Sequence, residues 1–166
     1  FSVAVTKKTG QSAYKSVILA RKDSGIHSLA DLKGHTFAFV DPSSASGHLF
    51  PKAGLEQAGF APDTLFKRVI FSGSHDASIL AVENKKVDAA AVADRIFASA
   101  VAKGVVKQDD FEIVWSSRPI PESPMVWRKA LDPALKKKVA DALASIKEVP
   151  WGDQGVLNGF QPTTDA

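Results

Sequence analysis

Two turns rich in serine and glycine carry the residues best suited to chemistry. The first, residues 41–47, reads Asp-Pro-Ser-Ser-Ala-Ser-Gly, and the second, residues 71–76, reads Phe-Ser-Gly-Ser-His-Asp. Each precedes a predicted helix, whose start leaves backbone N–H groups unpaired and carries partial positive charge. Serine hydroxyls and glycines there let a small oxyanion approach the backbone. For either turn alone, ordinary N-capping serines are the favoured explanation, but the pair together with His75 favours a cradle for a tetrahedral anion.

A hydrolytic role for the second turn is disfavoured. Ser74, His75 and Asp76 are consecutive, so at a helix start their side chains point in different directions and cannot form one relay, whose members come from separate segments. The first turn also lacks the leading glycine of a nucleophile elbow. A histidine at a helix start suits an anion donor, although an ordinary core or surface histidine is the common alternative.

The chain contains no recognisable motif for binding a metal ion or a nucleotide. The four histidines lack metal-binding spacing, there is no cysteine, and no Gly-Lys-Ser/Thr loop or Gly-x-Gly-x-x-Gly pattern occurs. We therefore expect no metal and no cofactor. The absence of cysteine also suits an oxidising compartment.

The composition predicts a folded α/β protein without nucleic-acid partners. The chain has 166 residues, of which 45% are apolar and 23% charged, enough for one domain or a two-lobed fragment. Its net charge of +3 is small and its basic residues are dispersed. Because the chain opens inside an apparent strand at Phe1, we expect a fragment, and the missing signal peptide says nothing about export.

Strand-like and helix-like segments alternate along the chain. The pattern predicts strands at 1–5, 16–20, 36–40, 66–71, 87–92 and 111–115, and helices at 49–58, 77–84, 94–103 and 133–146, with a short helical turn at 28–34. This alternation indicates an α/β fold with a mostly parallel sheet. Ligands of such sheets bind beyond the carboxyl ends of the strands, and both turns follow predicted strands.

Four further residues are candidates on weaker grounds. Tyr14 is the only tyrosine and precedes the strand at 16–20, where edge packing is the alternative role. Asp94 and Arg95 follow the strand at 87–92, and Asp94 is also a natural N-cap. Glu122 lies in a proline-rich crossing, where a solvated acid is the ordinary interpretation.

These motifs, in this order and spacing, resemble the phosphonate-binding periplasmic components of ABC transporters, type II solute-binding proteins that also take phosphite and hypophosphite. The matching stretches are residues 14–18, 31–34, 41–47, 72–78, 81–82, 87–90 and 120–121. The chain departs from the family pattern in two ways. It lacks a long segment ahead of Phe1, and Ala45 stands where a threonine is usual, which removes one hydroxyl.

The resemblance implies a periplasmic-binding-protein-like fold whose two lobes close on a ligand by a hinge. Residues 22–114 would form one complete lobe, and residues 1–21 and 115–166 would be remnants of the other with the hinge strands. The oxyanion would be held by Ser44, Ala45, Ser46 and His75. Tyr14 would add a hydroxyl, and Asp94 or Arg95, with Glu122, would contact the ligand's other end.

The implied function is capture of a phosphonate, phosphite or similar oxyanion for phosphorus uptake. The implied partner is a membrane-embedded transporter permease, with the protein in the periplasm or lipid-anchored on the extracellular face. Two alternatives stay open. One is a small α/β enzyme acting on phosphate esters or phosphonates, for which the sequence offers no nucleophile–base pair. The other is a ligand-sensing domain of the same fold.

Overall fold

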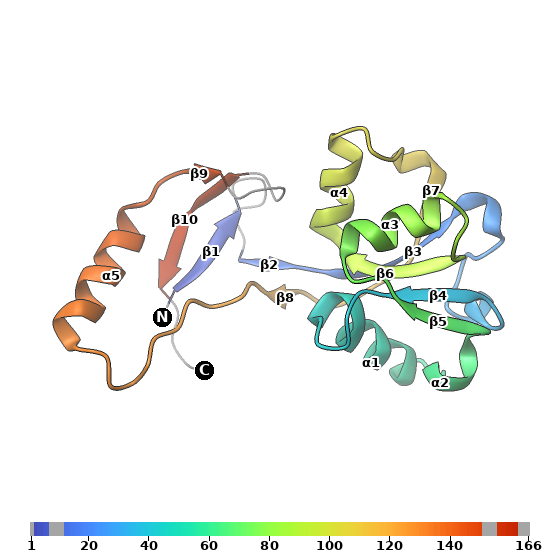
Figure 1. Cartoon of the computed structure of the whole chain (residues 1–166), viewed down its shortest axis with the longest axis horizontal. Coiled ribbons are helices and arrows are strands. Elements are labelled where there is room, and N and C mark those ends of the chain that lie inside the picture. The colour runs from blue at the N-terminus through green and yellow to red at the C-terminus, as the bar shows by residue number, and fades with distance from the viewer. Residues whose placement is uncertain (1, 7–11, 151–155, 163–166) are drawn as a thin grey trace. The chain divides into compact units, whose positions relative to one another are not determined.

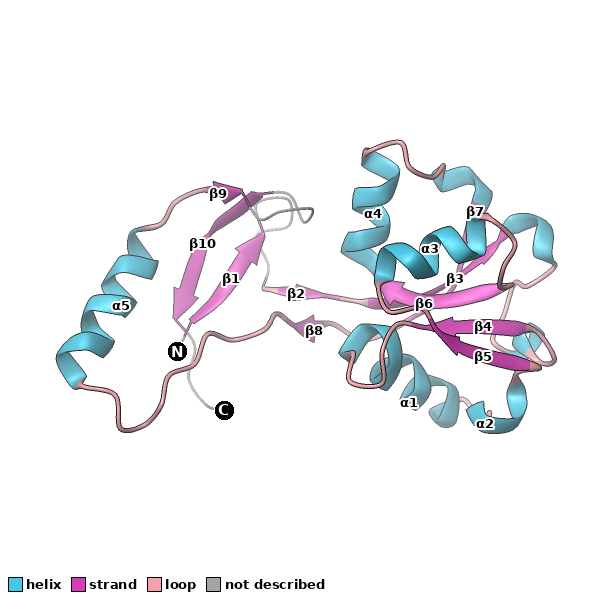
Figure 2. Ribbon diagram, viewed as in Figure 1, coloured by secondary structure: helices cyan, strands magenta, loops and turns pink. Residues whose placement is uncertain are grey.

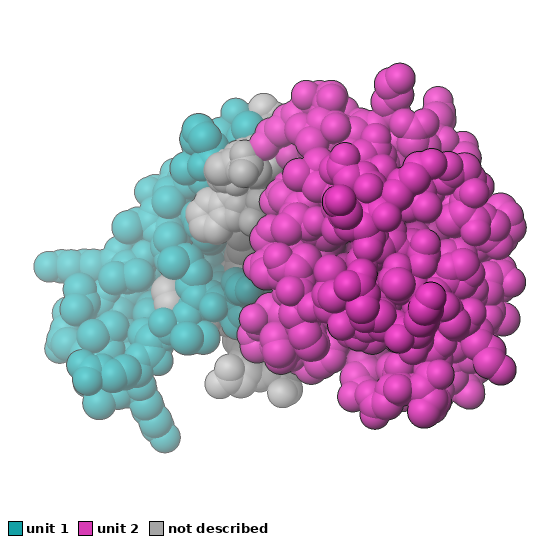
Figure 3. Space-filling model, turned by 45° about the vertical axis from the view of Figure 1, so that its right-hand side comes forward, with its two compact units in different colours: residues 1–13, 121–166 teal, residues 14–120 magenta. Residues whose placement is uncertain are grey.

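The structure, a computed structural model, describes residues 2–6, 12–150 and 156–162 (Figure 1). It divides the chain into two compact units. Unit 2 is the continuous segment Tyr14–Ile120, and unit 1 combines Phe1–Ala13 with Pro121–Ala166 (Figure 3). The two segments that connect the units, β2 (Ala13–Tyr14) and β8 (Ile120–Pro121), pair as a two-stranded sheet.

Unit 2 is built on a five-stranded sheet with the order β5-β4-β6-β3-β7. Its strands are β3 (Ser16–Arg21), β4 (Thr36–Phe39), β5 (Arg68–Phe71), β6 (Ala89–Ala93) and β7 (Phe111–Ser116). β4 pairs in parallel with β5 and β6, whereas β3 is antiparallel to both β6 and β7. Four strands therefore run in one direction, which confirms the predicted α/β fold with a mostly parallel sheet.

Helices cover both faces of this sheet (Figure 2). α1 (Phe50–Gln57) and α2 (Pro62–Leu65) lie on one side, and α3 (His75–Glu83) and α4 (Asp94–Ala102) lie on the other. Along β3, Val17 and Leu19 enter one buried cluster, while Ile18 and Ala20 enter the other. This burial on both faces explains why β3 is apolar along most of its length instead of alternating between apolar and polar residues.

Short helical turns complete unit 2. They are η1 (Lys22–Ser24), η2 (Ala30–Leu32) and η4 (Gln108–Asp110), together with the single π-helical turn η3 (Ala45–Leu49) that leads into α1. The predicted helical turn at 28–34 corresponds to η2. The predicted helix at 77–84 begins two residues earlier, at His75, because Ser74 is its N-cap.

The compact unit 2 extends beyond residues 22–114, the expected complete lobe, at both ends. Unit 2 begins at Tyr14 and ends at Ile120. β3 is an inner strand with hydrogen-bonded neighbours on both sides, and β7 continues to Ser116. Residues 14–21 and 115–120 are consequently part of the sheet unit rather than of unit 1.

The described residues of unit 1 form an antiparallel sheet with the order β1-β10-β9 and one helix. The strands are β1 (Ser2–Thr6), β9 (Val149–Pro150) and β10 (Val156–Pro162), and the helix is α5 (Pro133–Ser145). Asp132 caps α5, since its Oδ1 accepts the Leu135 N–H at 2.9 Å. None of the helices in the described ranges combines the length and apolar character needed to cross a membrane.

Candidate anion-binding site

The first serine-rich turn leaves the carboxyl end of β4 and is fixed by its own side chains. The Asp41 carboxylate accepts hydrogen bonds from the N–H of Ser43 at 2.8 Å and from its hydroxyl at 2.6 Å. Ser44 is the N-cap of η3, because its Oγ accepts the Gly47 N–H at 3.0 Å. That bond uses a lone pair of Ser44, so its own O–H can still donate to a ligand.

The start of η3 is also held from the sheet. Ser46 is buried, and its carbonyl accepts a 2.6 Å hydrogen bond from the hydroxyl of Ser16 at the head of β3. The N–H groups of Ala45 and Ser46 form no hydrogen bond with any residue that the structure describes. These are the unpaired donors that the start of a helix provides.

The second turn leaves the end of β5 and caps α3. The Oγ of Ser74 accepts the N–H of Ala77 at 3.1 Å. The Oγ of Ser72 lies 2.9 Å from the carbonyl of Ser74 and 2.7 Å from the Oγ of Ser78. The N-cap role that the sequence allowed is therefore confirmed for Ser44 and Ser74. Both turns also contain the backbone N–H groups of a helix start.

One residue joins the two turns. The N–H of Val40 donates to the carbonyl of Gly47 at 3.0 Å, and the carbonyl of Val40 accepts the N–H of Gly73 at 2.8 Å. Val40 follows directly after β4, so both turns are anchored to the same point on the sheet edge. The expectation that the two turns share this edge follows from the parallel pairing of β4 with β5.

His75 begins α3, and its protonation pattern is set by a backbone contact. The N–H of Ala93 donates to His75 Nδ1 at 3.1 Å. A ring nitrogen that accepts a hydrogen bond carries no proton, so the proton of the neutral imidazole sits on Nε2. Burial lowers the pKa of His75, and the nearby Arg95 charge lowers it further, against a smaller opposing effect of Asp76. His75 is thus a neutral Nε2–H donor.

Asp94 and Arg95 lie where β6 meets α4 and have different environments. Asp94 Oδ1 accepts the N–H of Lys15 at 3.0 Å and the N–H of Arg95 at 2.7 Å. Its own N–H donates to the carbonyl of Lys15 at 2.9 Å. The guanidinium carbon of Arg95 lies 4.6 Å from the centroid of the Tyr14 ring. Asp94 therefore fastens the end of β6 to the start of β3, and Arg95 stacks on the candidate tyrosine.

The structure places seven of the eight predicted ligand residues in unit 2. They are Tyr14, Ser44, Ala45, Ser46, His75, Asp94 and Arg95. Glu122 belongs to unit 1, where its N–H donates to the carbonyl of Ser12 at 2.8 Å. Sequence reasoning missed the supporting roles of Ser16, Val40 and Ala93, of which only Ser16, a serine heading an apolar strand, gave a visible signal.

The arrangement offers donors rather than a catalytic pair. The Nδ1 of His75 is occupied by a backbone donor, and Ser74 accepts a capping hydrogen bond. In the described part of the chain, no group of three or more His, Cys, Asp and Glu residues could hold a metal ion. What the site can do is bind an anion through backbone amides, hydroxyls and an imidazole N–H.

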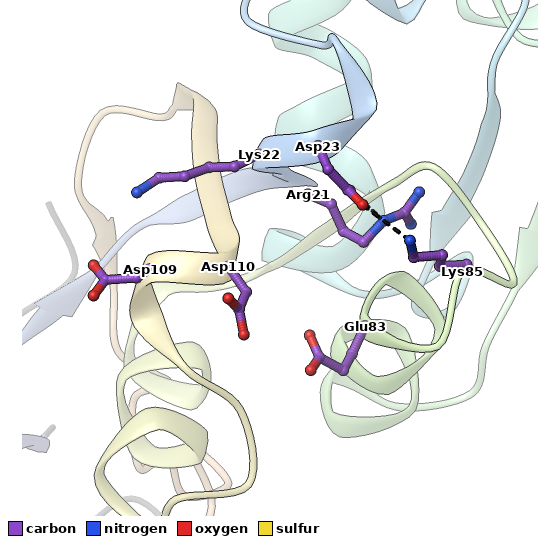
Figure 4. A pocket seen from close by; sticks show the side chains of 7 residues that line it. All are labelled: Arg21, Lys22, Asp23, Glu83, Lys85, Asp109 and Asp110. Atoms are coloured by element: carbon purple, nitrogen blue, oxygen red, sulfur yellow. Dashed lines mark hydrogen bonds and ion pairs between the residues drawn. The ribbon is translucent and has the colours of Figure 1, made fainter.

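A hollow of about 280 Å³ elsewhere in unit 2 has different chemistry (Figure 4). Asp23 accepts hydrogen bonds at 2.9 Å from both Arg21 and Lys85, and these contacts hold its pKa below the usual value. The lining residues are Arg21, Lys22, Asp23, Glu83, Lys85, Asp109 and Asp110. They surround the carboxyl end of β3, the strand that runs opposite to the others, so the hollow is at the far edge from both turns. Its paired, mixed charges do not make an oxyanion cradle.

Comparison with known proteins decides the family. The profile of the family described as "ABC transporter, phosphonate, periplasmic substrate-binding protein" matches residues 2–166. The chain belongs to this family. As a member, it is 34% identical over 145 residues to the phosphonates-binding periplasmic protein of Escherichia coli K12. That alignment covers 85% of this chain but 43% of the relative, so the chain spans less than half of that protein's length.

Solved structures of this family share the fold. A binding protein component of an ABC phosphonate transporter from Pseudomonas aeruginosa matches with a TM-score of 0.77 and 31% identity, over 97% of this chain and 56% of that one. A Prochlorococcus marinus protein solved in complex with methylphosphonate matches with a TM-score of 0.61 and 28% identity, over 72% and 47% of the two chains. The predicted periplasmic-binding-protein-like fold is confirmed by these neighbours.

Proposed function

We propose that this chain is part of a solute-binding protein that captures a small phosphorus oxyanion, such as a phosphonate or phosphite, for uptake by an ABC transporter. The observation that carries the proposal is the double anchoring of both serine-rich turns on Val40. This anchoring holds two helix starts at one point of the sheet edge, where oriented donors favour an anion. Family membership supports the same conclusion.

In this proposal, the oxyanion oxygens accept hydrogen bonds from the N–H groups of Ala45 and Ser46, from the Ser44 and Ser46 hydroxyls, and from His75 Nε2. The tautomer of His75 suits this role because Nδ1 already accepts the Ala93 N–H. Ala45 contributes only its backbone, since it lacks the usual threonine hydroxyl.

The remaining candidate residues act around this cradle. Tyr14 and Arg95 flank it as a stacked pair, and Asp94 positions the strand ends that carry them. Glu122 would contact the ligand's other end from unit 1. The lobe division around 22–114 and hinge closure at the two crossings belong to the same proposal, and the pairing of β2 with β8 supports the hinge.

The protein's partner would be a membrane-embedded permease. The protein would be located in the periplasm or lipid-anchored on the extracellular face of the membrane, and it would bind its ligand without turnover. The family's role as transporter substrate-binding proteins supports these points. The enzyme alternative needs a nucleophile activated by a base, and His75 has its Nδ1 engaged by the backbone.

Calorimetric titration of the complete protein that contains this chain tests the proposal. The panel is phosphate, phosphite, methylphosphonate, aminoethylphosphonate and sulfate. We expect at least one phosphorus oxyanion to bind, and Ser46→Leu to weaken it about tenfold or more, because a lost hydrogen bond to a charged group costs roughly 1.5–3 kcal/mol. Unchanged affinity in a folded Ser46→Leu protein would contradict the site. Phosphonate or phosphate-ester turnover that His75→Ala abolishes would favour the enzyme.

A further inference from the structure

We propose that Pro51 is a positioning residue of the anion site. Because a proline has no N–H, it leaves the carbonyl groups of Ser46 and Gly47 to anchor the first serine-rich turn on the sheet edge. Pro51 is fully buried near the start of α1 and is not one of the proposed ligand donors. This inference rests on the proposed function and identifies what holds its backbone donors in place.

The helix that carries Pro51 begins with π spacing. η3 continues into α1 without a break, so Pro51 is an interior helix residue and not the first one. The N–H of Leu49 donates to the carbonyl of Ser44 at 3.0 Å, and the N–H of Phe50 donates to the carbonyl of Ala45. Each of these bonds spans five residues instead of the four of an α-helix, a spacing that is rare outside single turns.

The two carbonyl groups that residue 51 would engage both bond to the sheet. An N–H at this position would donate to the carbonyl of Gly47 with α spacing, or to that of Ser46 with π spacing. Pro51 can make neither bond, and with α spacing its ring would clash with the Gly47 carbonyl. Instead, Gly47 accepts the Val40 N–H at 3.0 Å, and Ser46 accepts the Ser16 hydroxyl at 2.6 Å. These are the bonds that tie the first turn to the ends of β4 and β3.

A hydrogen-bond donor at position 51 would compete with these contacts. The helix could then return to the ordinary α spacing, in which the new N–H takes the Gly47 carbonyl from the Val40 N–H. The first turn would lose its connection to the end of β4, and the N–H groups of Ala45 and Ser46 would move with it. Pro51 therefore acts on the ligand through the position of these two amides.

Calorimetric titration of the complete protein with methylphosphonate tests the inference in two variants. Pro51→Ala and Pro51→Val both restore the N–H, but valine has as many side-chain carbon atoms as proline and so keeps the buried volume filled. We expect both variants to bind about tenfold more weakly, which corresponds to the loss of about one hydrogen bond to a charged group. Wild-type affinity in Pro51→Val would assign any effect to the missing ring and would overturn the inference.

Pro62→Ala is the matched control. Pro62 is also buried, but it is the first residue of α2, where a backbone N–H needs no partner within the helix. Both alanine variants lose a buried ring and gain freedom in the unfolded chain, so their urea midpoints should fall by similar amounts. Only Pro51→Ala should lose affinity, and an equal loss of affinity in Pro62→Ala would contradict a specific role for Pro51.

Amide hydrogen exchange of the ligand-free protein tests the anchoring directly. The N–H of Val40 should exchange at least tenfold faster in Pro51→Ala than in Pro62→Ala, because it loses its acceptor only in the first variant. Equal exchange rates would overturn the inference. If Ser46→Leu weakens methylphosphonate binding while both Pro51 variants bind like wild type, the inference fails and the proposed function stands. Failure of the wild-type protein to bind any phosphorus oxyanion would instead contradict the proposed function.

Discussion

Replacing Gly47 with alanine tests the site without touching a ligand donor. A Cβ at position 47 would lie against the Cβ of Val40, 2.5 Å from Val40 Cγ2 and 2.8 Å from Ser44 Oγ. Carbon atoms in contact need about 3.5–4.0 Å, so the turn must move by about 1 Å away from the strand end. Val40 is β-branched and stiff at χ1, so it cannot easily yield.

The displacement should act on binding and on stability together. Moving the start of η3 shifts the N–H groups of Ala45 and Ser46, and the loss of one charge-assisted hydrogen bond costs roughly 1.5–3 kcal/mol, or about tenfold or more in affinity. Overpacking of this kind also costs about 1–3 kcal/mol of folding stability. Methylphosphonate titration and urea denaturation of the complete protein measure the two effects.

Gly54→Ala is the matched control. Gly54 lies in α1, and a Cβ there would collide with the Trp115 indole, with 2.8 Å to Cε2 and 2.9 Å to Cη2. We expect a comparable loss of stability, because the clash is similar, but an unchanged methylphosphonate affinity, because α1 carries no proposed donor. If Gly47→Ala binds methylphosphonate like wild type, or if Gly54→Ala loses affinity equally, the reasoning about the turn is refuted.

Three further predictions concern the same half of the site. Ser16→Ala removes the 2.6 Å hydrogen bond to the carbonyl of Ser46. It should lower the free energy of unfolding by about 1 kcal/mol and also weaken methylphosphonate binding. An unchanged affinity would show that this hydrogen bond does not position the site. The lowered pKa of His75 contributes stability that is present above the unfolded-state pKa near 6.5 and is lost as the pH falls below that value. His75→Gln should therefore lose less stability than the wild type between pH 7.5 and 5. Equal losses in the two proteins would contradict a buried, neutral His75 ring. The chain of residues 1–166 alone should bind methylphosphonate more weakly than the complete protein, because a closed cleft strengthens polar contacts by excluding water. Equal affinities in parallel titrations would contradict this and show that residues 1–166 suffice for binding.

Much of the secondary structure of unit 2 is predictable, because the apolar runs and helix-ending glycines that indicate it lie within short stretches of sequence. The apolar run at 16–20 and the strand at 36–40 appear as β3 and β4, and helix 49–58 ends before Gly59, whose φ of +84° only glycine adopts readily. The strand at 87–92 is shifted, because β6 begins at Ala89 while the Asp88 carboxylate accepts the Thr36 N–H.

The two serine-rich turns can be located from the sequence, but the contacts that connect them cannot. Nothing local reveals that Val40 joins both turns, or that the Ala93 N–H selects the tautomer of His75, since these contacts span long sequence separations. The same holds for β10, whose Gly159 and Pro162 resemble turn residues. It forms a strand because it pairs with β1 from the other end of the chain.

An NMR titration of the complete, ¹⁵N-labelled protein with methylphosphonate shows directly whether the two turns hold the oxyanion. We predict that the backbone amides of Ala45 and Ser46 and the Nε2–H of His75 shift strongly downfield and show scalar coupling to ³¹P across the hydrogen bonds, with His75 Nδ1 unprotonated throughout. Saturable binding in which these three groups keep their free-state shifts, while signals elsewhere in the protein respond, would contradict it.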